Sequence, residues 1–211
     1  MPEQLADQKA ALARIQEHLE KASERVLIGI IGKPGAGKST LSKFLMGKLP
    51  KDLVTVVPMD GYHLSNKVLK DLKRSDRKGA PDTFDVAGFV SLVKRIRSEQ
   101  TQNIYYPIFD RAIEESIAAQ GVVTSATKVV IIEGNYLLHD EGGWEVLNDL
   151  LDESWMVDVD DDKRISRLIS RHIAYGKDPE AAKAWAKGTD EVNAKLIERG
   201  RTRADFVVAI D

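Results

Sequence analysis

The chain has 211 residues, of which 43% are hydrophobic, so it can bury one sizeable core but is short for two full domains. Its 31 basic and 33 acidic residues leave a formal net charge of −2, which argues against a nucleic-acid partner and favours a small molecule. The absence of cysteine excludes disulfides and thiolate metal sites.

The N-terminal segment predicts an amphipathic helix packed against the body of the protein. Leu5, Leu12, Ile15 and Leu19 recur at approximately helical spacing between charged residues over residues 3–24. The segment has no apolar centre of its own, and no later segment approaches the roughly 18 apolar residues of a membrane span. We therefore expect a cytoplasmic protein without a membrane partner.

Five apolar runs predict the strands of a mainly parallel sheet, because strands covered on both faces read as continuous apolar segments. The runs are residues 26–31, 53–58, 129–132, 154–159 and 206–210. Helical patterns separate them, at residues 38–48, 87–98, 142–152, 162–175 and 179–199. This alternation predicts an α/β sandwich of three layers, with ligands bound at the carboxyl ends of the strands.

Residues 103–123 do not fit this alternation. The segment reads NIYYPIFDR and then IEESIAAQGVV, in which polar and apolar residues alternate in places. Such a pattern indicates a small antiparallel β excursion outside the main sheet. Since the sequence shows no repeat, low-complexity tract or linker, we expect a single domain over residues 1–211.

A glycine-rich motif joins the first predicted strand to the helix after it. The segment GKPGAGKS, residues 32–39, matches G-x-x-x-x-G-K-[ST], whose backbone N–H groups and helix N-terminus form a cradle for phosphate. Lys38 would hold the β- and γ-phosphate oxygens of ATP, and the Ser39 hydroxyl would bind Mg²⁺. A chance match is the alternative, but the strand before the motif and the helix after it favour nucleotide binding. The predicted nucleotide-binding residues here are Gly32, Lys33, Pro34, Gly35, Ala36, Gly37, Lys38, Ser39 and Thr40.

Two acidic residues follow predicted strands at the edge of the sheet where the loop lies. Asp60 comes just after the run LVTVVP, and Glu133 comes just after VVII. A carboxylate in such a place can hold Mg²⁺, directly or through water, and another can accept the proton of an attacking hydroxyl. We predict Glu133 as the metal ligand, because Gly134 lets a backbone approach closely. For each acid, a solvated position at a strand end is the alternative.

Five segments occur in the order seen in the phosphoribulokinase/uridine kinase family, which the chain resembles over roughly residues 26–210. They are GKPGAGKST, PMDGYHLSN, GAPDTFD, YYPIFDR and VVIIEGNYLL. Together they are specific to the family but not to one substrate, and they look closest to a branch of nucleoside kinase-like and fructose-transport-system kinase-like proteins. The resemblance implies a P-loop fold with a lid, and transfer of the γ-phosphate of ATP to a hydroxyl of a sugar, nucleoside or pantothenate-like metabolite.

The resemblance also implies roles for single residues. Asp60, in MDGYH, matches the general base that acts on the acceptor hydroxyl, and Asp85, in DTFD, matches an acid that grips sugar hydroxyls in nucleoside kinases. The predicted substrate-binding residues are Tyr62, His63, Asp85, Tyr106, Phe109, Asp110 and Arg111. For Tyr106 and Phe109 the alternative is a place in the hydrophobic core, and for His63 it is a hydrogen-bonded surface position.

Three arginines, Arg164, Arg167 and Arg171, recur at three- and four-residue spacing and so share one face of a predicted helix. In the family this helix leads into a lid. The resemblance implies that residues 160–202 form the lid and C-terminal helices, that Arg167 binds the nucleotide and that Arg171 acts in catalysis. A solvated basic face is the alternative. His172 stands where uridine kinases often carry aspartate, and the C-terminal segment is more like that of pantothenate kinase.

Other classes of P-loop protein fit less well. A GTPase should add D-x-x-G and N-K-x-D motifs, but the segment NKVL fails at its fourth position, and no LSGGQ-like stretch of an ABC-type ATPase is present. A nucleotide-dependent regulator or assembly factor stays open, as does a homodimer. The acceptor is open too, because the six basic residues within 67–78 indicate either an acidic or phosphorylated substrate or an exposed helix face.

Overall fold

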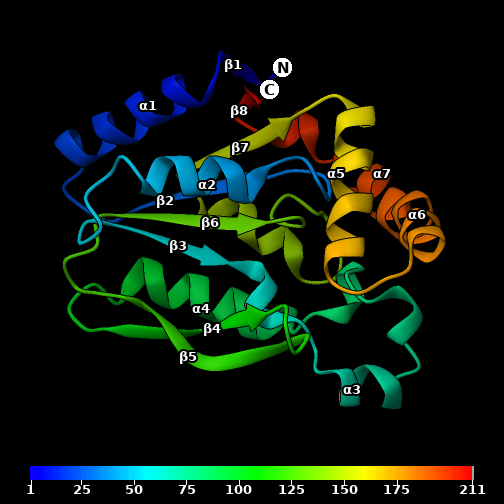
Figure 1. The fold of residues 1–211 in the computed structure, drawn as a ribbon. Helices are drawn as coiled ribbons and strands as arrows, with labels where there is room; N and C mark the ends of the chain where they lie inside the picture. The colour runs from blue at the N-terminus through cyan, green and yellow to red at the C-terminus, as the bar shows by residue number, and fades with distance from the viewer. Residues whose placement is uncertain (211) are drawn as a thin grey trace.

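The computed structural model describes residues 1–210, and its centre is a six-stranded sheet in which every pair of neighbouring strands is parallel (Figure 1). The strand order is β1-β8-β7-β2-β6-β3. The strands are β1 Glu3–Leu5, β2 Val26–Ile31, β3 Val54–Pro58, β6 Val129–Gly134, β7 Glu153–Asp158 and β8 Phe206–Ala209. The predicted α/β fold with a mainly parallel sheet is confirmed, with one strand more than the five predicted.

The additional strand lies where the sequence predicted the start of the first helix. Residues Glu3–Leu5 pair with Phe206–Val208 at the edge of the sheet. The helix, α1, spans Gln8–Lys21, and the Asp7 carboxylate before it accepts two backbone N–H groups of its first turn. The helix predicted over residues 3–24 is therefore wrong for its first residues, because Leu5 fits the helical spacing but belongs to an edge strand.

Helices cover both faces of the sheet, with α1 and α2 Lys38–Met46 packed on one face and α4 Val86–Ser98 on the other. The remaining helices are α3 Asn66–Asp71, α5 Asp161–Ala174, α6 Pro179–Lys187 and α7 Thr189–Glu198. Leu27 and Ile31 of β2 pack in a cluster with α4, whereas Ile28 and Ile30 pack in a second cluster with α1 and α2. Since alternate residues of one strand are buried on opposite faces, the strand reads as a continuous apolar run.

Two predicted helices differ from the structure. The pattern at residues 142–152 forms a short 3₁₀ helix, η4 Trp144–Leu150, which starts after two glycines with positive φ, Gly142 and Gly143. The pattern at residues 179–199 is divided into α6 and α7 at Gly188, which lies outside the helical region at φ −99° and ψ −97°. Further single turns of 3₁₀ helix are η1 Met59–Tyr62, η2 Ser75–Arg77, η3 Pro81–Thr83 and η5 Arg201–Arg203.

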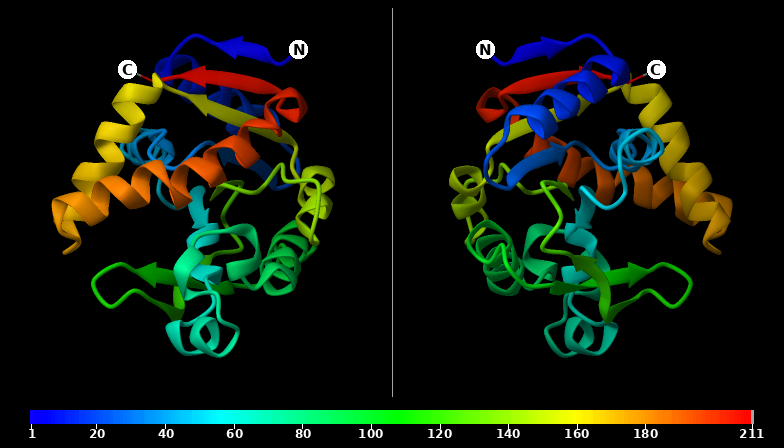
Figure 2. Two further views of the ribbon diagram at one scale, coloured as in Figure 1. Left: turned by 90° about the vertical axis from the view of Figure 1, so that its right-hand side faces the viewer. Right: turned by 90° about the vertical axis from the view of Figure 1, so that its left-hand side faces the viewer.

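The predicted antiparallel excursion is confirmed as a hairpin of β4 Ile104–Asp110 and β5 Glu115–Val123. The pairing is irregular between Tyr106 and Ile108, around Pro107, which has no N–H to donate. Figure 2 shows that the hairpin and helices α5 and α6 project on the same side of the molecule. The chain thus places two separate structures around the carboxyl ends of the central strands.

Candidate active site

The phosphate-binding loop connects β2 to α2, as its motif predicts. Gly35 and Gly37 have φ values of 80° and 97°, in the left-handed region that favours glycine. Gly37 is the N-cap of α2, so the unpaired N–H groups of the first helical turn open onto the loop. A Cβ on Gly35 would lie 2.7 Å from the backbone oxygen of Arg164, which shows how closely α5 packs against the loop.

Lys38 folds back into this loop. Its Nζ donates hydrogen bonds to the backbone oxygens of Gly32, at 2.9 Å, and Lys33, at 3.3 Å. Burial lowers the pKa of the Lys38 ammonium group to about 8, although the carboxylates of Glu133 and Asp60 oppose the shift. A bound phosphate would bring full negative charge to Nζ, so nucleotide binding favours the protonated form.

Glu133 ends β6 and is held by two hydroxyl groups of α2. Ser39 Oγ donates to Oε1 over 2.5 Å, and Ser42 Oγ donates to Oε2 over 2.7 Å. The hydroxyl of Ser39 and the carboxylate of Glu133 are hard oxygen donors of the kind that Mg²⁺ prefers, so these residues fit the ion. Within residues 1–210 no group of three or more His, Asp and Glu could hold a metal alone, so nucleotide phosphates and water would complete the shell.

Asp60 follows β3 in the turn η1, beside the β4–β5 hairpin. A Cβ on the next residue, Gly61, would lie 2.1 Å from the backbone oxygen of Pro107, so only glycine allows this approach. Arg111 Nη2 donates to Asp60 Oδ2 over 2.7 Å. Burial raises the pKa of the Asp60 carboxyl, but opposing positive charges outweigh it and leave the pKa below its ordinary value. Those charges belong to His63 in its protonated form, Arg111, Lys38 and Arg171.

His63 lies between two aromatic rings in the same wall. Its ring centroid is 4.1 Å from that of Phe84 and 4.7 Å from that of Phe109. Burial lowers the pKa of His63, so the imidazole is neutral at physiological pH. Its Nδ1 lies 2.8 Å from the backbone oxygen of Asp60 and must donate to it, which leaves Nε2 as a hydrogen-bond acceptor.

The three arginines of α5 have three different environments. Arg164 is buried and pairs with Asp161 and Glu191 at 2.7 and 2.6 Å, so it is part of the packing of α5. Arg167 is exposed, with Nη1 3.6 Å from the position of a Cβ on Gly37. Arg171 is half-buried and lines the cleft described next. The three arginines, which the spacing predicts on one helix face, therefore do three different things: one packs α5 against its neighbours, one lies beside the nucleotide loop and one lines the cleft.

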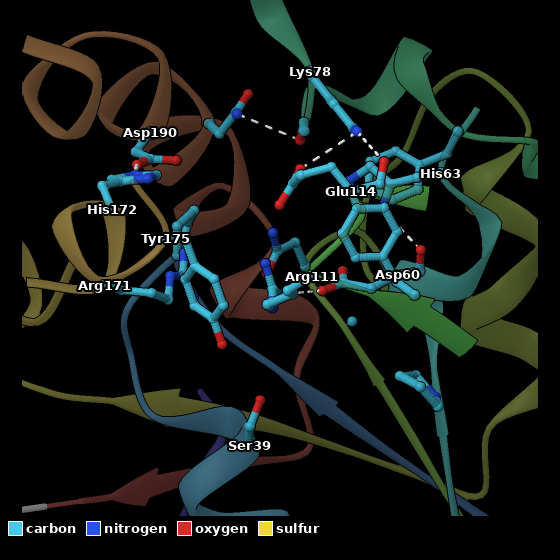
Figure 3. A pocket seen from close by; sticks show the side chains of 18 of the residues that line it. Ser39, Asp60, His63, Lys78, Arg111, Glu114, Arg171, His172, Tyr175 and Asp190 are labelled. Atoms are coloured by element: carbon cyan, nitrogen blue, oxygen red, sulfur yellow. Dashed lines mark hydrogen bonds and ion pairs between the residues drawn. The ribbon is translucent and has the colours of Figure 1, made fainter. Parts of the chain in front are cut away.

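A cleft of about 430 Å³ lies between the loop, the hairpin and the α5–α7 helices (Figure 3). It collects predicted residues from five separate segments of the chain. These are Pro34, Lys38, Ser39, Asp60, His63, Phe109, Arg111, Glu133 and Arg171. Their roles remain predictions, but the cleft has room for a small molecule beside the phosphate loop.

Four predicted substrate-binding residues do not line this cleft. Tyr106 is buried, and its hydroxyl donates to the backbone oxygen of Val56 at 2.9 Å. Tyr62 packs against the ring of Phe89 of α4 at 5.3 Å between centroids. Asp85 caps α4, and Asp110 accepts the N–H of Ala112 in the hairpin turn. Of the predicted nucleotide residues, Lys33 instead pairs with Asp161 at 2.9 Å, Ala36 is buried and Thr40 is exposed.

Other residues line the cleft without having been predicted as site residues. Lys78 and Glu114 lie on the hairpin side, and Tyr175, Trp185 and Asn193 lie on the lid side. No motif marks these positions, since each is a single polar or aromatic residue outside the five segments that carry the family resemblance. Of the six basic residues within 67–78, the cleft contains only Lys78, because Arg74 and Arg77 pair with Asp82 and the three other lysines are exposed.

Comparison with known proteins identifies the family to which the chain belongs. The model of the phosphoribulokinase/uridine kinase family matches residues 27–210. The chain belongs to this family. Members transfer phosphate, and relatives named as kinases agree, so the protein is a P-loop phosphotransferase that binds ATP.

Three similar proteins illustrate the relationship. A Silicibacter sp. TM1040 protein, whose crystal structure is named for a fructose transport system kinase, is 39% identical with a TM-score of 0.85, covering 95% of this chain and 98% of that one. A Schizosaccharomyces pombe protein that carries the name of a uridine kinase is 32% identical, covering 90% of this chain and 85% of that protein. The ATP-dependent kinase-like protein notR' of Aspergillus versicolor is 36% identical, and the match covers 68% of this chain and 88% of that protein.

Over residues 1–210, no helix combines the length and the hydrophobicity that a membrane span requires.

Proposed function

We propose that this kinase transfers the γ-phosphate of ATP to a hydroxyl of a small metabolite bound between Asp60 and the lid helices. The observation that carries the proposal is the position of Asp60. Its carboxylate lines the same cleft as Lys38 and Ser39 of the phosphate loop, and Arg111 is its sole side-chain partner among the described residues, through Oδ2. Oδ1 is therefore free to receive an acceptor hydroxyl.

In the proposed reaction, Asp60 takes the proton that the acceptor hydroxyl loses, and ADP is the leaving group. The acceptor hydroxyl donates its proton to Asp60 as its oxygen forms a bond to the γ-phosphorus, the bond from that phosphorus to the β–γ bridging oxygen breaks, and ADP leaves. Lys38 would offset negative charge on the transferring group, and Arg171 would do so from the lid. Ser39 and Glu133 would hold Mg²⁺, which would supply Lewis-acid stabilisation of the phosphate charge.

The classes of acceptor that we consider are sugars, nucleosides and pantothenate-like metabolites. Two similar proteins carry names that refer to fructose transport and to uridine. The cleft offers His63 Nε2 as an acceptor for a second hydroxyl and the ring of Phe109 as an apolar wall, which suits a short polyhydroxylated molecule. A cytoplasmic location fits a consumer of ATP.

The test is ATP turnover with and without a panel of hydroxylated compounds from these classes. A kinase should form ADP rapidly only when the right acceptor is present, and should form the phosphate ester in equal amount. Asp60→Asn should lower kcat by about 10²- to 10⁴-fold with little change in the Kd for a non-hydrolysable ATP analogue.

The same experiment has outcomes that would reject the proposal. Turnover that no hydroxylated acceptor stimulates would favour a nucleotide-dependent regulator instead. Recovery of Asp60→Asn by excess Mg²⁺ would make Asp60 a metal ligand, and a parallel loss of analogue binding would make it part of the nucleotide site. Thermal melting of the variant shows whether the protein assayed is folded.

A further inference from the structure

Arg111 has hydrogen-bonding capacity that the protein itself does not use. It lies in the turn between β4 and β5, and Figure 3 shows its guanidinium group beside Asp60 in the cleft. A guanidinium group has five N–H donors. Among the described residues its sole hydrogen bond is from Nη2 to Asp60, and its side chain is 40% exposed. Most of its donors therefore face the space in which the acceptor would bind.

The turn that carries Arg111 is fixed in place. The carboxylate of Asp110 accepts the N–H of Ala112 at 2.8 Å inside the turn. The backbone oxygen of Glu114, a residue with φ of 55°, accepts hydrogen bonds from Asn66 Nδ2 at 3.2 Å and from Lys78 Nζ at 2.8 Å. The turn is thus tied to the segment after α3, so Arg111 presents its donors from a preorganised position.

Lys78, the other cation on this side of the cleft, has no such spare capacity. Its Nζ lies 2.8 Å from Asn66 Oδ1, 2.8 Å from the Glu114 backbone oxygen and 3.4 Å from the Glu114 carboxylate. An ammonium group has three N–H donors, and these contacts use them. Arg111 is therefore the cation on the hairpin side that can bind a ligand.

The charges around Asp60 change during the proposed reaction. Lys38 and Arg171 would bind the phosphates, which leaves Arg111 with Asp60 as its counter-charge. When Asp60 accepts the hydroxyl proton, that negative charge is lost while the charge of Arg111 remains. A negative group on the acceptor would restore the balance of charge. It would also offset the mutual repulsion of Arg111 and Arg171, which both line the cleft.

We propose that the acceptor carries an anionic group, a carboxylate or a phosphate, a few bonds from the hydroxyl that is phosphorylated, and that Arg111 binds this group. The proposal rests on the proposed kinase function and narrows its substrate class to hydroxy acids and sugar phosphates. The planar fork of a guanidinium group matches both anions. The close contact of Asp60 with Arg111 sets the short spacing between the hydroxyl and the anion.

Matched acceptor pairs test the charge requirement. Glycerate and glycerol differ by a carboxylate against a hydroxymethyl group, whereas ribose 5-phosphate and ribose differ by a phosphate. The acidic member of at least one pair should have a kcat/KM about 30- to 100-fold above that of its neutral partner, as expected for charged hydrogen bonds. The carboxylate and phosphate pairs show which anion is bound. Equal or better turnover of the neutral members would overturn the proposal.

Arg111→Gln tests the residue. Its KM for the acidic acceptor should rise about 30- to 100-fold while the Kd for an ATP analogue stays unchanged, and Arg111→Lys should recover part of the loss. Arg77→Gln is the matched control, because Arg77 pairs with Asp82 outside the cleft. A fall in kcat by one factor for acidic and neutral acceptors alike would mean that Arg111 acts only through Asp60, and weaker analogue binding would place it at the nucleotide. Either result overturns the proposal.

Failure of the kinase function itself would be visible separately. If no compound of either charge is phosphorylated, calorimetry with the same four compounds in the presence of an ATP analogue still measures the anion site. Binding of an acidic compound to the wild type but not to Arg111→Gln would support the site. Absence of binding by all acidic compounds would reject it.

Discussion

The hydroxyl of Ser42 donates a 2.7 Å hydrogen bond to the Glu133 oxygen that Ser39 does not contact. Ser42 is 4% exposed, so this bond is shielded from water. Because each serine binds one carboxylate oxygen, the plane of the carboxylate is fixed relative to α2. Ser42 is therefore a positioning residue for Glu133, the proposed Mg²⁺ ligand. Because the P-loop motif ends before Ser42, the motif does not reveal this role.

Ser42→Ala should raise the Mg²⁺ concentration for half-maximal activity about 10-fold, because loss of an outer-shell partner weakens metal sites by this order. Glu133→Gln should raise it further. The KM for the acceptor should change little in either variant. Ser91→Ala is the control, since its hydroxyl donates to the backbone of α4 away from the cleft. An unchanged Mg²⁺ titration for both Ser42→Ala and Glu133→Gln would remove Glu133 from the metal site.

When the protein binds a nucleotide at alkaline pH, the Lys38 side chain should take up a proton. The pKa of Lys38 is about 8 in the free protein because burial lowers it, and a bound phosphate raises it. Affinity for an ATP analogue should therefore be highest below pH 8 and fall as the pH rises above 8, where the free lysine loses its proton. Calorimetry at pH 8.5 in two buffers of different ionisation enthalpy measures the uptake.

Lys38→Ala is the control for this proton uptake. It should abolish phosphate transfer, since the charge of the transferring group is no longer offset, and it should also abolish the uptake. Uptake of the same size in Lys38→Ala would assign the proton to another group. Near-normal transfer in this variant would contradict the role given to the loop lysine.

Gly35→Ala should weaken nucleotide binding and stability together. The new Cβ would lie 2.7 Å from the backbone oxygen of Arg164 and 2.8 Å from Leu168 Cγ, at a φ of 80°. We expect a loss of about 1–3 kcal/mol in the free energy of unfolding, and at least a 10-fold rise in the Kd for an ATP analogue. Gly176→Ala has a similar φ of 93° but no atom within 4 Å, so it isolates the backbone strain. Equal effects of the two variants would mean that contact with α5 is unimportant.

Glu153 should make stability sensitive to acid. This buried carboxylate accepts hydrogen bonds from Arg14 at 2.7 Å and Trp155 at 2.9 Å, and it lies 2.7 Å from His18 Nε2. Burial raises the pKa of Glu153, but these partners outweigh burial and lower it below the ordinary 4.5. A lowered folded-state pKa contributes stability that is present above pH 4.5 and is lost as the pH falls through the folded-state value.

Glu153→Gln should lower the free energy of unfolding by about 1–3 kcal/mol at pH 7, and the difference from the wild type should shrink in acid. Urea unfolding at pH 7 and at pH 3.5 measures both. Glu17→Gln is the control, because Glu17 is an exposed partner of Lys21 and its loss should leave stability nearly unchanged at both pH values. A constant difference at both pH values would show that the charge of Glu153 is unimportant.

The sequence alone determined those features that follow from local pattern. Buried strands are continuous apolar runs, so all five predicted strands of the sheet begin and end within two residues of their observed bounds, and the largest difference is at the run 129–132, which continues to Gly134. The phosphate loop needs left-handed backbone at Gly35 and Gly37, and only glycine adopts it freely. Its motif is therefore visible without a structure.

Tertiary structure alone decided which residues share the cleft. Asp60 and Arg111 are 51 positions apart, and their contact depends on the hairpin folding back over η1, where Gly61 admits the backbone of Pro107. Tyr106 shares the hairpin with Arg111 but is buried. Side chains alternate between the two faces of a strand, and the irregular pairing at Pro107 shifts the register of this alternation. Periodicity and motifs describe neighbours along the chain, whereas the acceptor site is built from side chains that only the packing of distant segments brings together.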